Sequence, residues 1–211
     1  MEQASDEVLF EQYRTGDRGA LRTLIERHQA ELMRFLIRLA GDAAGAEDVF
    51  QETFLQIHLS ADTFDPTRRF RPWLFTIAAN KARDYLRRKG RRRMLELSAP
   101  VDNGSDDSGT SYVDLMEINL PGPDARLDAE ETSRLVQEAL DEMPPLLREI
   151  LLLAYFQRLS YAQMHDELGI PLGTVKSRLH AAVAAFAKKW DALARARGST
   201  EDHPRTPPHT P

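Results

Sequence analysis

The sequence predicts an all-α protein made of two small helical domains joined by a flexible acidic linker. Apolar residues recur at helical spacing in both halves of the chain, and no segment alternates apolar and polar residues as a half-buried strand would. A stretch rich in Ser, Asp, Gly and Asn separates the two halves. The chain has 211 residues, of which 42% are hydrophobic, and this suffices for two small cores.

Three helices are expected in the first half. The first covers about residues 21–39 and stops at Gly41. The second covers about residues 46–59. The third begins near Pro72, whose fixed φ suits a first helical turn, and it runs into a basic cluster at 87–93. The segment between the second and third helices contains an Asp-Pro turn signal and is expected to be a loop.

The second half contains a helix-turn-helix pattern. An apolar stripe that begins near Leu127 predicts one helix, and the prolines at 144–145 end it and open the next. Ser160 can cap a short helix that ends at Gly169, a natural left-handed C-cap. Pro171 then starts another helix. Two short helices joined by a tight glycine turn form a helix-turn-helix.

Composition divides the chain into four segments. We expect a first domain over 1–93, an acidic flexible linker over 94–126, a second domain over 127–190 and a disordered Pro-rich tail over 191–211. The linker carries an apolar patch at 112–120 with no assigned role. Because a flexible linker joins two small units, we expect the two domains to tumble loosely until a partner orders them.

The net charge of −5 conceals two blocks of opposite sign. Residues 68–93 hold eleven basic side chains and one acidic side chain, whereas residues 94–131 hold one basic and ten acidic side chains. A single dense basic block in an acidic protein indicates one place where the chain binds a polyanion.

Several classes of protein are not favoured by the sequence. The chain has no cysteine, which excludes disulfides, thiolate metal sites and cysteine nucleophiles. Its start has no signal-peptide pattern, and no run approaches the roughly 18 apolar residues of a membrane span, so we expect a cytoplasmic protein. The six histidines lack metal-ligand spacing, and no phosphate-binding loop or nucleophile-elbow motif occurs. We therefore expect no catalytic residue, metal, cofactor or small-molecule substrate.

The second helix of the helix-turn-helix carries candidate DNA contacts. Val175 and Leu179 are expected to face inward. The opposite side presents Thr174, Lys176, Ser177, Arg178 and His180. A helix fits the major groove of B-DNA, and its N-terminal residues reach base edges. An ordinary helical hairpin with solvated charges is the alternative.

The basic block forms a second candidate surface. One polar stripe of the third helix holds Asn80, Arg83, Asp84, Arg87 and Arg88. Three aromatic residues lie just before it, namely Phe64, Phe70 and Trp73. Aromatic rings beside arginines can stack on unpaired bases. The alternative is a solvated charged face, with Trp73 in the core.

The helix over 46–59 carries a third candidate surface. Beside its core stripe, a mixed stripe with i, i+3, i+4, i+7 spacing holds Asp48, Gln51, Glu52 and Leu55. A second stripe of this kind can bind a protein partner, and plain solvent exposure is the alternative. Asp48 and Glu52 are poor candidates for paired catalytic acids, because an exposed helix gives them neither burial nor a proton partner.

Three segments, in this order, resemble parts of bacterial RNA polymerase sigma factors, and more narrowly of the small two-domain extracytoplasmic-function (ECF) group. The family's polymerase-binding helix, with its DxxQExF motif, resembles AEDVFQETFLQIH. Its promoter-melting and −10-reading helix resembles FRPWLFTIAANKARDYLRR. Its −35-reading helix-turn-helix resembles SYAQMHDELGIPLGTVKSRLH. The resemblance covers about residues 8–93 and 127–190.

The resemblance implies a non-enzymatic subunit that binds core RNA polymerase and directs promoter-specific initiation by −35 and −10 recognition and DNA melting. It implies polymerase-binding residues at the β′ clamp helices: Asp48, Gln51, Glu52, Phe54 and Leu55. It implies −10 DNA-binding residues: Phe64, Arg69, Asn80, Lys81, Arg83, Arg87 and Arg88. It implies −35 DNA-binding residues: Thr174, Lys176, Ser177, Arg178 and His180.

The same resemblance implies further partners and roles. The polymerase β flap, promoter DNA and an anti-sigma factor are expected partners. The loop at 60–71, with Asn80, takes a flipped base of the non-template strand. The acidic linker runs through the RNA path of the polymerase.

Three positions depart from the family pattern. His165 stands where the family usually has Ala, so it must fit a tight gap or point outward. Ala181 and Val183 stand where the family favours arginines. The loss of two cations should weaken phosphate contacts and reduce the salt dependence of −35 binding.

Two other functions compete with this one. A stand-alone helix-turn-helix regulator would bind palindromic sites as a dimer, yet no dimerisation helix is visible. A metal-dependent nuclease would need convergent carboxylates, and the acidic residues cluster in the linker instead.

Overall fold

A computed structural model of the chain describes residues 4–89 and 126–198, and within these ranges it is all-helical, as predicted. The first half contains α1 (Asp6–Arg14), α2 (Arg18–Ala40), α3 (Ala43–Leu59), the short 3₁₀ turn η1 (Ala61–Thr63) and α4 (Phe70–Lys89). The second half contains α6 (Arg126–Asp141), α7 (Pro145–Gln157), α8 (Tyr161–Leu168) and α9 (Leu172–Gly198). No helix in the described ranges combines the length and the hydropathy that a membrane span needs.

Local capping explains where the predicted helices begin and end. The Asp17 carboxylate accepts the Gly19 N–H at the start of α2, and Gly41 ends that helix with φ 84°. Ser160 and Gln163 form a capping box at the start of α8, and Gly169 ends α8 with φ 64°. The left-handed backbone at both stops favours glycine. The predicted helix-turn-helix is therefore confirmed, with Val175 and Leu179 buried.

Helix α1 is an element that the sequence analysis did not predict. Its N-cap is Ser5, whose side chain accepts the Val8 N–H, and two acidic residues occupy its first turn. Phe10 is fully buried, with its ring 4.9 Å from that of Phe70 and 5.4 Å from that of Trp73. The helix thus closes one end of the first core.

Two of the expected segments lie partly or almost wholly outside the described residues. The linker over 94–126 is described only at Arg126, where α6 begins, and the patch at 112–120 is not described. The tail was expected from residue 191, but α9 continues to Gly198. This boundary was wrong because the alanine-rich segment after Trp190 has no helix breaker before Gly198. Residues 199–211 lie outside the described ranges.

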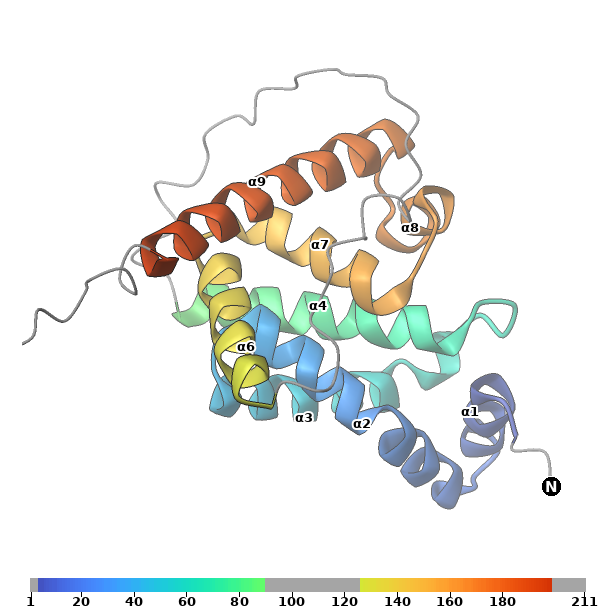
Figure 1. Cartoon of the computed structure of the whole chain (residues 1–211). Coiled ribbons are helices and arrows are strands. Elements are labelled where there is room, and N and C mark those ends of the chain that lie inside the picture. The colour runs from blue at the N-terminus through green and yellow to red at the C-terminus, as the bar shows by residue number, and fades with distance from the viewer. Residues whose placement is uncertain (1–3, 90–125, 199–211) are drawn as a thin grey trace, which may run out of the picture.

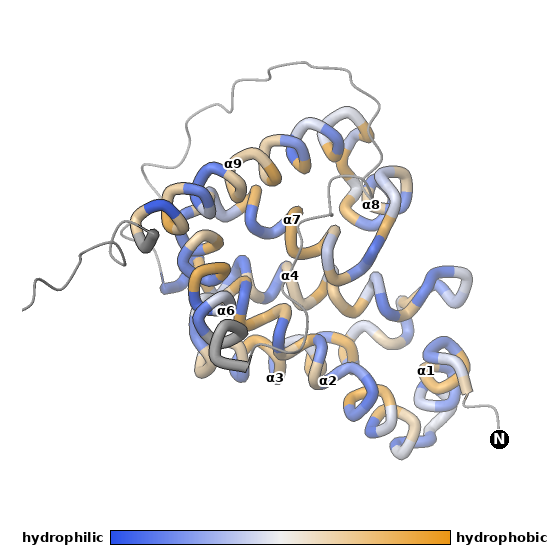
Figure 2. Tube along the Cα trace, viewed as in Figure 1, coloured by the Kyte–Doolittle hydropathy of each residue, from blue (hydrophilic) through white to orange (hydrophobic). Residues whose placement is uncertain are grey.

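The two helical units pack against each other, where the sequence predicted loosely tumbling domains. Helix α7 lies between α9 on one side and α2 and α4 on the other (Figure 1). The ring of Phe156, near the end of α7, packs edge-on against Phe35 of α2 at 5.6 Å. Hydrophobic and hydrophilic stretches alternate along α2 and α9 (Figure 2). In α7, seven of the eight residues from Leu147 to Ala154 are buried, so buried residues lie on more than one side of the helix. A helix that is apolar nearly all round needs cover on two sides, and its own domain supplies only one.

Candidate functional site

Helices α3 and α4 cross closely because a glycine lies where they meet. Gly45, in the first turn of α3, is buried, and a Cβ atom added to it would lie 2.4 Å from the hydroxyl oxygen of Tyr85. No larger residue fits there unless the tyrosine ring moves. This close approach brings the exposed face of α3 beside the C-terminal half of α4.

The exposed face of α3 and the end of α4 line a shallow groove. From α3 it receives the four residues here named the α3 stripe: Asp48, Gln51, Glu52 and Leu55. From α4 it receives Tyr85, Arg88 and Lys89. Leu55 is open to solvent, with 58% of the residue exposed. An exposed leucine flanked by carboxylates is a surface that a partner protein can cover.

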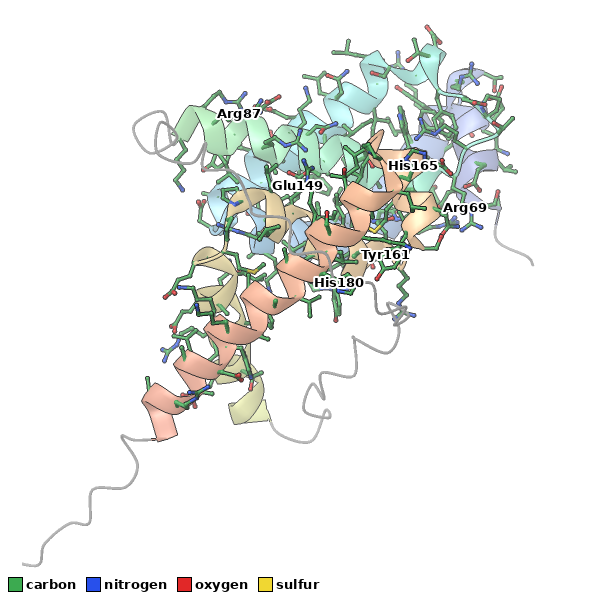
Figure 3. All side chains as sticks on the ribbon, turned by 90° about the horizontal axis from the view of Figure 1, so that it is seen from above. Arg69, Arg87, Glu149, Tyr161, His165 and His180 are labelled. Carbon is green, nitrogen blue, oxygen red and sulfur yellow. The ribbon has the colours of Figure 1, made fainter. Side chains whose placement is uncertain are left out.

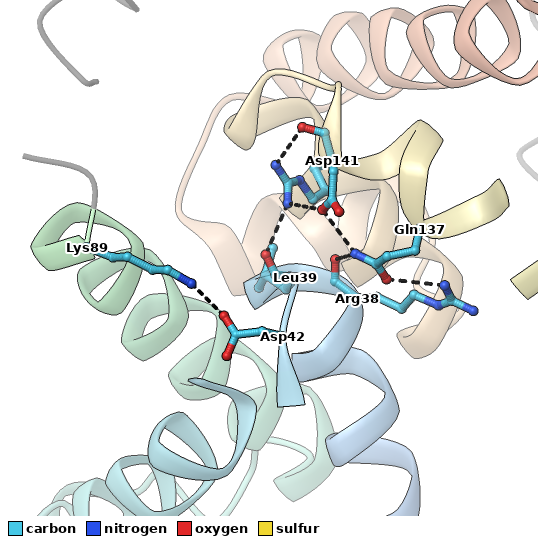
Figure 4. A network of polar contacts seen from close by, with 7 residues as sticks. Arg38, Leu39, Asp42, Lys89, Gln137 and Asp141 are labelled. Carbon is cyan, nitrogen blue, oxygen red and sulfur yellow. Dashed lines mark hydrogen bonds and ion pairs between the residues drawn. The ribbon is translucent and has the colours of Figure 1, made fainter. Parts of the chain in front are cut away.

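Two ion pairs bridge α3 and α4. Arg88 Nη2 donates to Glu52 Oε1 at 2.8 Å, and Lys89 Nζ donates to Asp42 Oδ2 at 2.6 Å (Figure 4). The hydrogen bond with Lys89 lowers the pKa of the Asp42 carboxyl, and the same bond raises the pKa of Lys89. Both pairs are solvent-exposed and therefore contribute little to stability, so a charged partner can replace either one at small cost.

Two predicted contact residues lie in the core instead of on a surface. Phe54, expected at the polymerase-binding face, is buried and packs against Phe50 with ring centroids 4.9 Å apart. Phe64, expected at the −10 element, is buried against Trp73 at 4.6 Å. Both rings lie on the apolar side of their segment, so they position neighbouring residues without being open to a partner.

The polar residues predicted along α4 have different surroundings. Asn80 and Arg87 are exposed, as is Arg69 in the preceding loop. Lys81 is half-buried and donates to Gln56 Oε1 at 2.8 Å. We name Asn80, Arg83, Arg87 and Arg88 the basic face of α4.

Arg83 differs from the other arginines of the basic face because its partner belongs to the second helical unit. Its Nε donates to Glu149 Oε2 at 3.0 Å, and its Nη2 donates to Glu149 Oε1, which gives a bidentate pair. Figure 3 shows Glu149 between α7 and α4, with Arg87 farther along α4. The hydrogen bonds that Arg83 donates to Glu149 raise the pKa of Arg83 above its usual value. Bidentate pairs of this kind are among the stronger hydrogen-bonded contacts in proteins.

The helix-turn-helix presents its predicted residues at the start of α9. Lys176 and Ser177 are exposed, whereas Thr174, Arg178 and His180 are half-buried. These side chains point away from the buried pair Val175 and Leu179, as the helical spacing requires. The first turns of α9 therefore present cationic and hydroxyl-bearing side chains outside the buried stripe.

His165 points outward and closes the turn of this motif. The residue is exposed on α8, and its Nδ1 lies 2.6 Å from the carbonyl oxygen of Ile170 (Figure 3). A histidine is therefore accommodated without a tight gap. Ala181 and Val183 are half-buried and offer no cation, as the sequence already indicated.

The sequence analysis missed Glu149 as a partner of the basic face. The signal was present in α7, where the adjacent charges Arg148 and Glu149 interrupt an apolar run. Both residues are 8% exposed, and buried charges are nearly always paired. In the described ranges, no group of three or more His, Asp or Glu side chains is placed to hold a metal ion.

Comparison with known proteins assigns both halves of the chain. The family description "Sigma-70 region 2" matches residues 24–92, and "Sigma-70, region 4" matches residues 133–186. The ECF RNA polymerase sigma factor SigL of Mycobacterium tuberculosis is 39% identical over 167 residues, which cover 79% of this chain and 86% of the relative.

Solved structures share the fold. CnrH, solved in complex with the cytosolic domain of CnrY, matches with TM-score 0.59 and 26% identity over 92% of this chain and 99% of that chain. The sigma factor RpoE, solved with the anti-sigma factor NepR from Bartonella quintana, matches with TM-score 0.57 and 22% identity over 81% of this chain and 96% of that chain.

The α3 stripe and the basic face thus lie in region 2, and the helix-turn-helix lies in region 4. The chain belongs to the ECF group of sigma-70 family RNA polymerase sigma factors, non-enzymatic proteins that direct promoter-specific transcription initiation.

Proposed function

We propose that region 2 of this sigma factor binds core RNA polymerase through the α3 stripe, at the β′ clamp helices, and the −10 element through the loop at 60–71 and the basic face of α4. The supporting observation is that Arg88 of the basic face lines the same groove as the α3 stripe. A polymerase bound to α3 would therefore hold α4 in a fixed orientation toward the promoter. Among the residues predicted to contact the −10 element, Arg69, Asn80, Arg87 and Arg88 are exposed and Lys81 is half-buried.

We also propose that region 4 reads the −35 element through the start of α9, with the polymerase β flap as its protein partner. Lys176 and Ser177 are exposed at the N-terminal end of a long helix, where base edges are reached first. Arg178 and His180 follow along the same helix and are half-buried. The missing cations at Ala181 and Val183 leave fewer phosphate contacts than a helix with arginines there would make.

An anti-sigma factor is the expected regulatory partner, and the cytoplasm is the expected location because RNA polymerase and promoter DNA are found there. RpoE, of similar fold, was solved with the anti-sigma factor NepR. In this chain, α3 exposes Leu55 and Leu59, the latter to 68%. A protein that covers these leucines would block the surface proposed for the polymerase.

Charge reversal on the α3 stripe tests polymerase binding. Asp48→Arg with Gln51→Arg should abolish binding to core polymerase and run-off transcription while leaving the helical circular dichroism spectrum unchanged. The matched control is Glu26→Arg with Gln29→Arg, which makes the same chemical change at the same spacing on an exposed face of α2. Equal polymerase binding by the two double variants would refute the assignment of α3.

Arg178→Ala tests −35 reading. If the guanidinium reads a base, the substitution should cost about 1–3 kcal/mol of binding free energy on the preferred −35 sequence and relax the preference at one position. Electrophoretic mobility shifts over a set of single-base variants measure both quantities. A loss that is uniform over all sequences would make Arg178 a phosphate contact.

A further inference from the structure

Region 4 is attached to region 2 by polar contacts at both ends of their interface. At one end, Arg71 of α4 donates to the carbonyl oxygen of Phe156 at 2.8 Å, and Arg68 pairs with Glu167 of α8 at 2.5 Å. Near the other end lies the bidentate pair between Arg83 and Glu149. Four helices are thereby held together: α4, α7, α8 and, through Phe35 and Phe156, α2.

A second cluster of contacts joins α2 to α6 and α7 (Figure 4). Arg38 Nη2 donates to the Ser133 hydroxyl oxygen at 2.7 Å, and its Nη1 donates to the Ser133 carbonyl oxygen at 2.8 Å. Gln137 Nε2 lies 3.4 Å from the carbonyl oxygen of Arg38. The buried guanidinium of Arg148 donates to the carbonyl oxygen of Leu39 at 3.4 Å and pairs with Asp141.

These contacts have the character of an interface that can separate. The ion pairs across it have partly exposed side chains, which is typical of reversible contacts between domains, and the apolar contact between Phe35 and Phe156 lies beside them. The closed arrangement also leaves polar atoms buried without a partner in the described ranges, namely Arg148 Nε and both amide atoms of Gln157. Unsatisfied groups of this kind cost free energy that exposure to water would recover.

We propose that this arrangement is a closed state in which Glu149 of α7 locks region 4 onto region 2 and withholds Arg83 from promoter DNA. The proposal rests on the proposed function, because it takes Arg83 to be a DNA contact. The Arg83 guanidinium donates to both oxygens of Glu149, so a DNA phosphate and Glu149 compete for the same donors.

The physical consequence is weak DNA binding by the free chain. A carboxylate carried on the same chain acts at a high effective concentration, which a phosphate in solution must overcome. The apparent dissociation constant equals the intrinsic constant divided by the fraction of open molecules. Core polymerase, which binds region 2 and region 4 at separate sites, would hold the two regions apart and free Arg83.

The experiment uses the full chain with two substitutions that weaken the lock from opposite sides. Glu149→Gln removes a carboxylate on the region 4 side. Arg38→Gln removes, on the region 2 side, the guanidinium that contacts Ser133 of region 4. Glu142→Gln is the matched control, because Glu142 loses the same charge but pairs with Lys189 inside region 4. Circular dichroism melting establishes that each variant folds, and either lock variant alone suffices for the test.

Two quantities are measured for each protein. The first is the distance between spin labels on Ala30→Cys in α2 and Ala184→Cys in α9, exposed positions in a chain that has no cysteine of its own. The second is the affinity for a fluorescent pool of short single-stranded DNA of random sequence. We expect both lock variants to lengthen the distance and to bind the DNA about threefold to thirtyfold more tightly than Glu142→Gln and the unsubstituted chain.

Two results would overturn the lock. The first is a distance in the unsubstituted chain as long and as broad as in both lock variants. The second is a lengthened distance with no gain in DNA affinity. Run-off transcription with core polymerase separates this failure from failure of the proposed function. Initiation by all four proteins with equal DNA affinities rejects the lock alone, whereas absence of polymerase binding and of initiation from all of them rejects the proposed function together with the lock.

Discussion

Two arginines of α4 are each paired with a glutamate, but in different surroundings. Arg88 pairs with Glu52 in the open groove, where their side chains are 54% and 39% exposed. Arg83 pairs with Glu149 beneath region 4, where the corresponding values are 35% and 10%. Water competes strongly for the first pair and weakly for the second. The same two residue types therefore give an exchangeable surface contact in one place and a clamp between domains in the other.

Removing the carboxylate from each pair tests whether the two ion pairs contribute differently to stability. Glu149→Ala should lower the free energy of unfolding by about 1–2 kcal/mol, a value reduced from that of a fully buried pair because Arg83 can regain water. Glu52→Ala should lower it by less than about 0.5 kcal/mol. Urea unfolding of both variants measures the difference. Equal losses would show that burial under region 4 does not strengthen the pair with Arg83.

A change in helix spacing tests the groove without removing any charge. Gly45→Ala places a Cβ atom against the Tyr85 ring and should cost about 1 kcal/mol, because the ring can move aside only in part. Gly173→Ala is the control, since no atom lies within 4 Å of its added Cβ and alanine favours the helix. Thermal melting should show a lower midpoint for the first variant and an equal or higher one for the second. The reverse order would mean that α3 and α4 are not held close by Gly45.

Asp6 supplies a third ion pair, in which the carboxylate is 16% exposed, between Glu149 at 10% and Glu52 at 39%. Burial raises the pKa of the Asp6 carboxyl. The hydrogen bonds from His28 at 2.8 Å and from Arg27 together lower it by more, so the pKa ends below its usual value of 3.8. A lowered folded-state pKa means stability that is present above about pH 4 and lost as the pH falls through the folded value. We expect this contribution to be below about 1 kcal/mol.

The pH dependence of unfolding measures that contribution. Asp6→Asn should lose part of the difference in unfolding free energy between pH 7 and acid, whereas Asp62→Asn, at an exposed position, should retain it. Identical pH profiles for Asp6→Asn and the unsubstituted chain would show that the pair with His28 does not anchor α1.

Much of the fold follows from local features of the sequence. Gly41, Ser160 and Gly169 end or begin helices through hydrogen bonds to residues at most four positions away, so these boundaries are predictable. Helix α1 was equally accessible, because Ser5 and the acids after it form an N-terminal signal. The surface residues of α3 and of the helix-turn-helix follow from helical period. Phe54, expected as a polymerase contact from the family resemblance, lies in the core, where the apolar stripe of the helix places it.

Most of the helices, several of their ends, the family and the exposed stripes can be predicted from the sequence alone, because each depends on residues within a few turns of one another. Tertiary packing alone places Arg83 against Glu149, 66 positions away, covers α7 on both sides and buries Phe64 under Trp73. These contacts depend on where one helix comes to rest against another. That placement results from the shapes of many side chains packed together, and no local pattern encodes it.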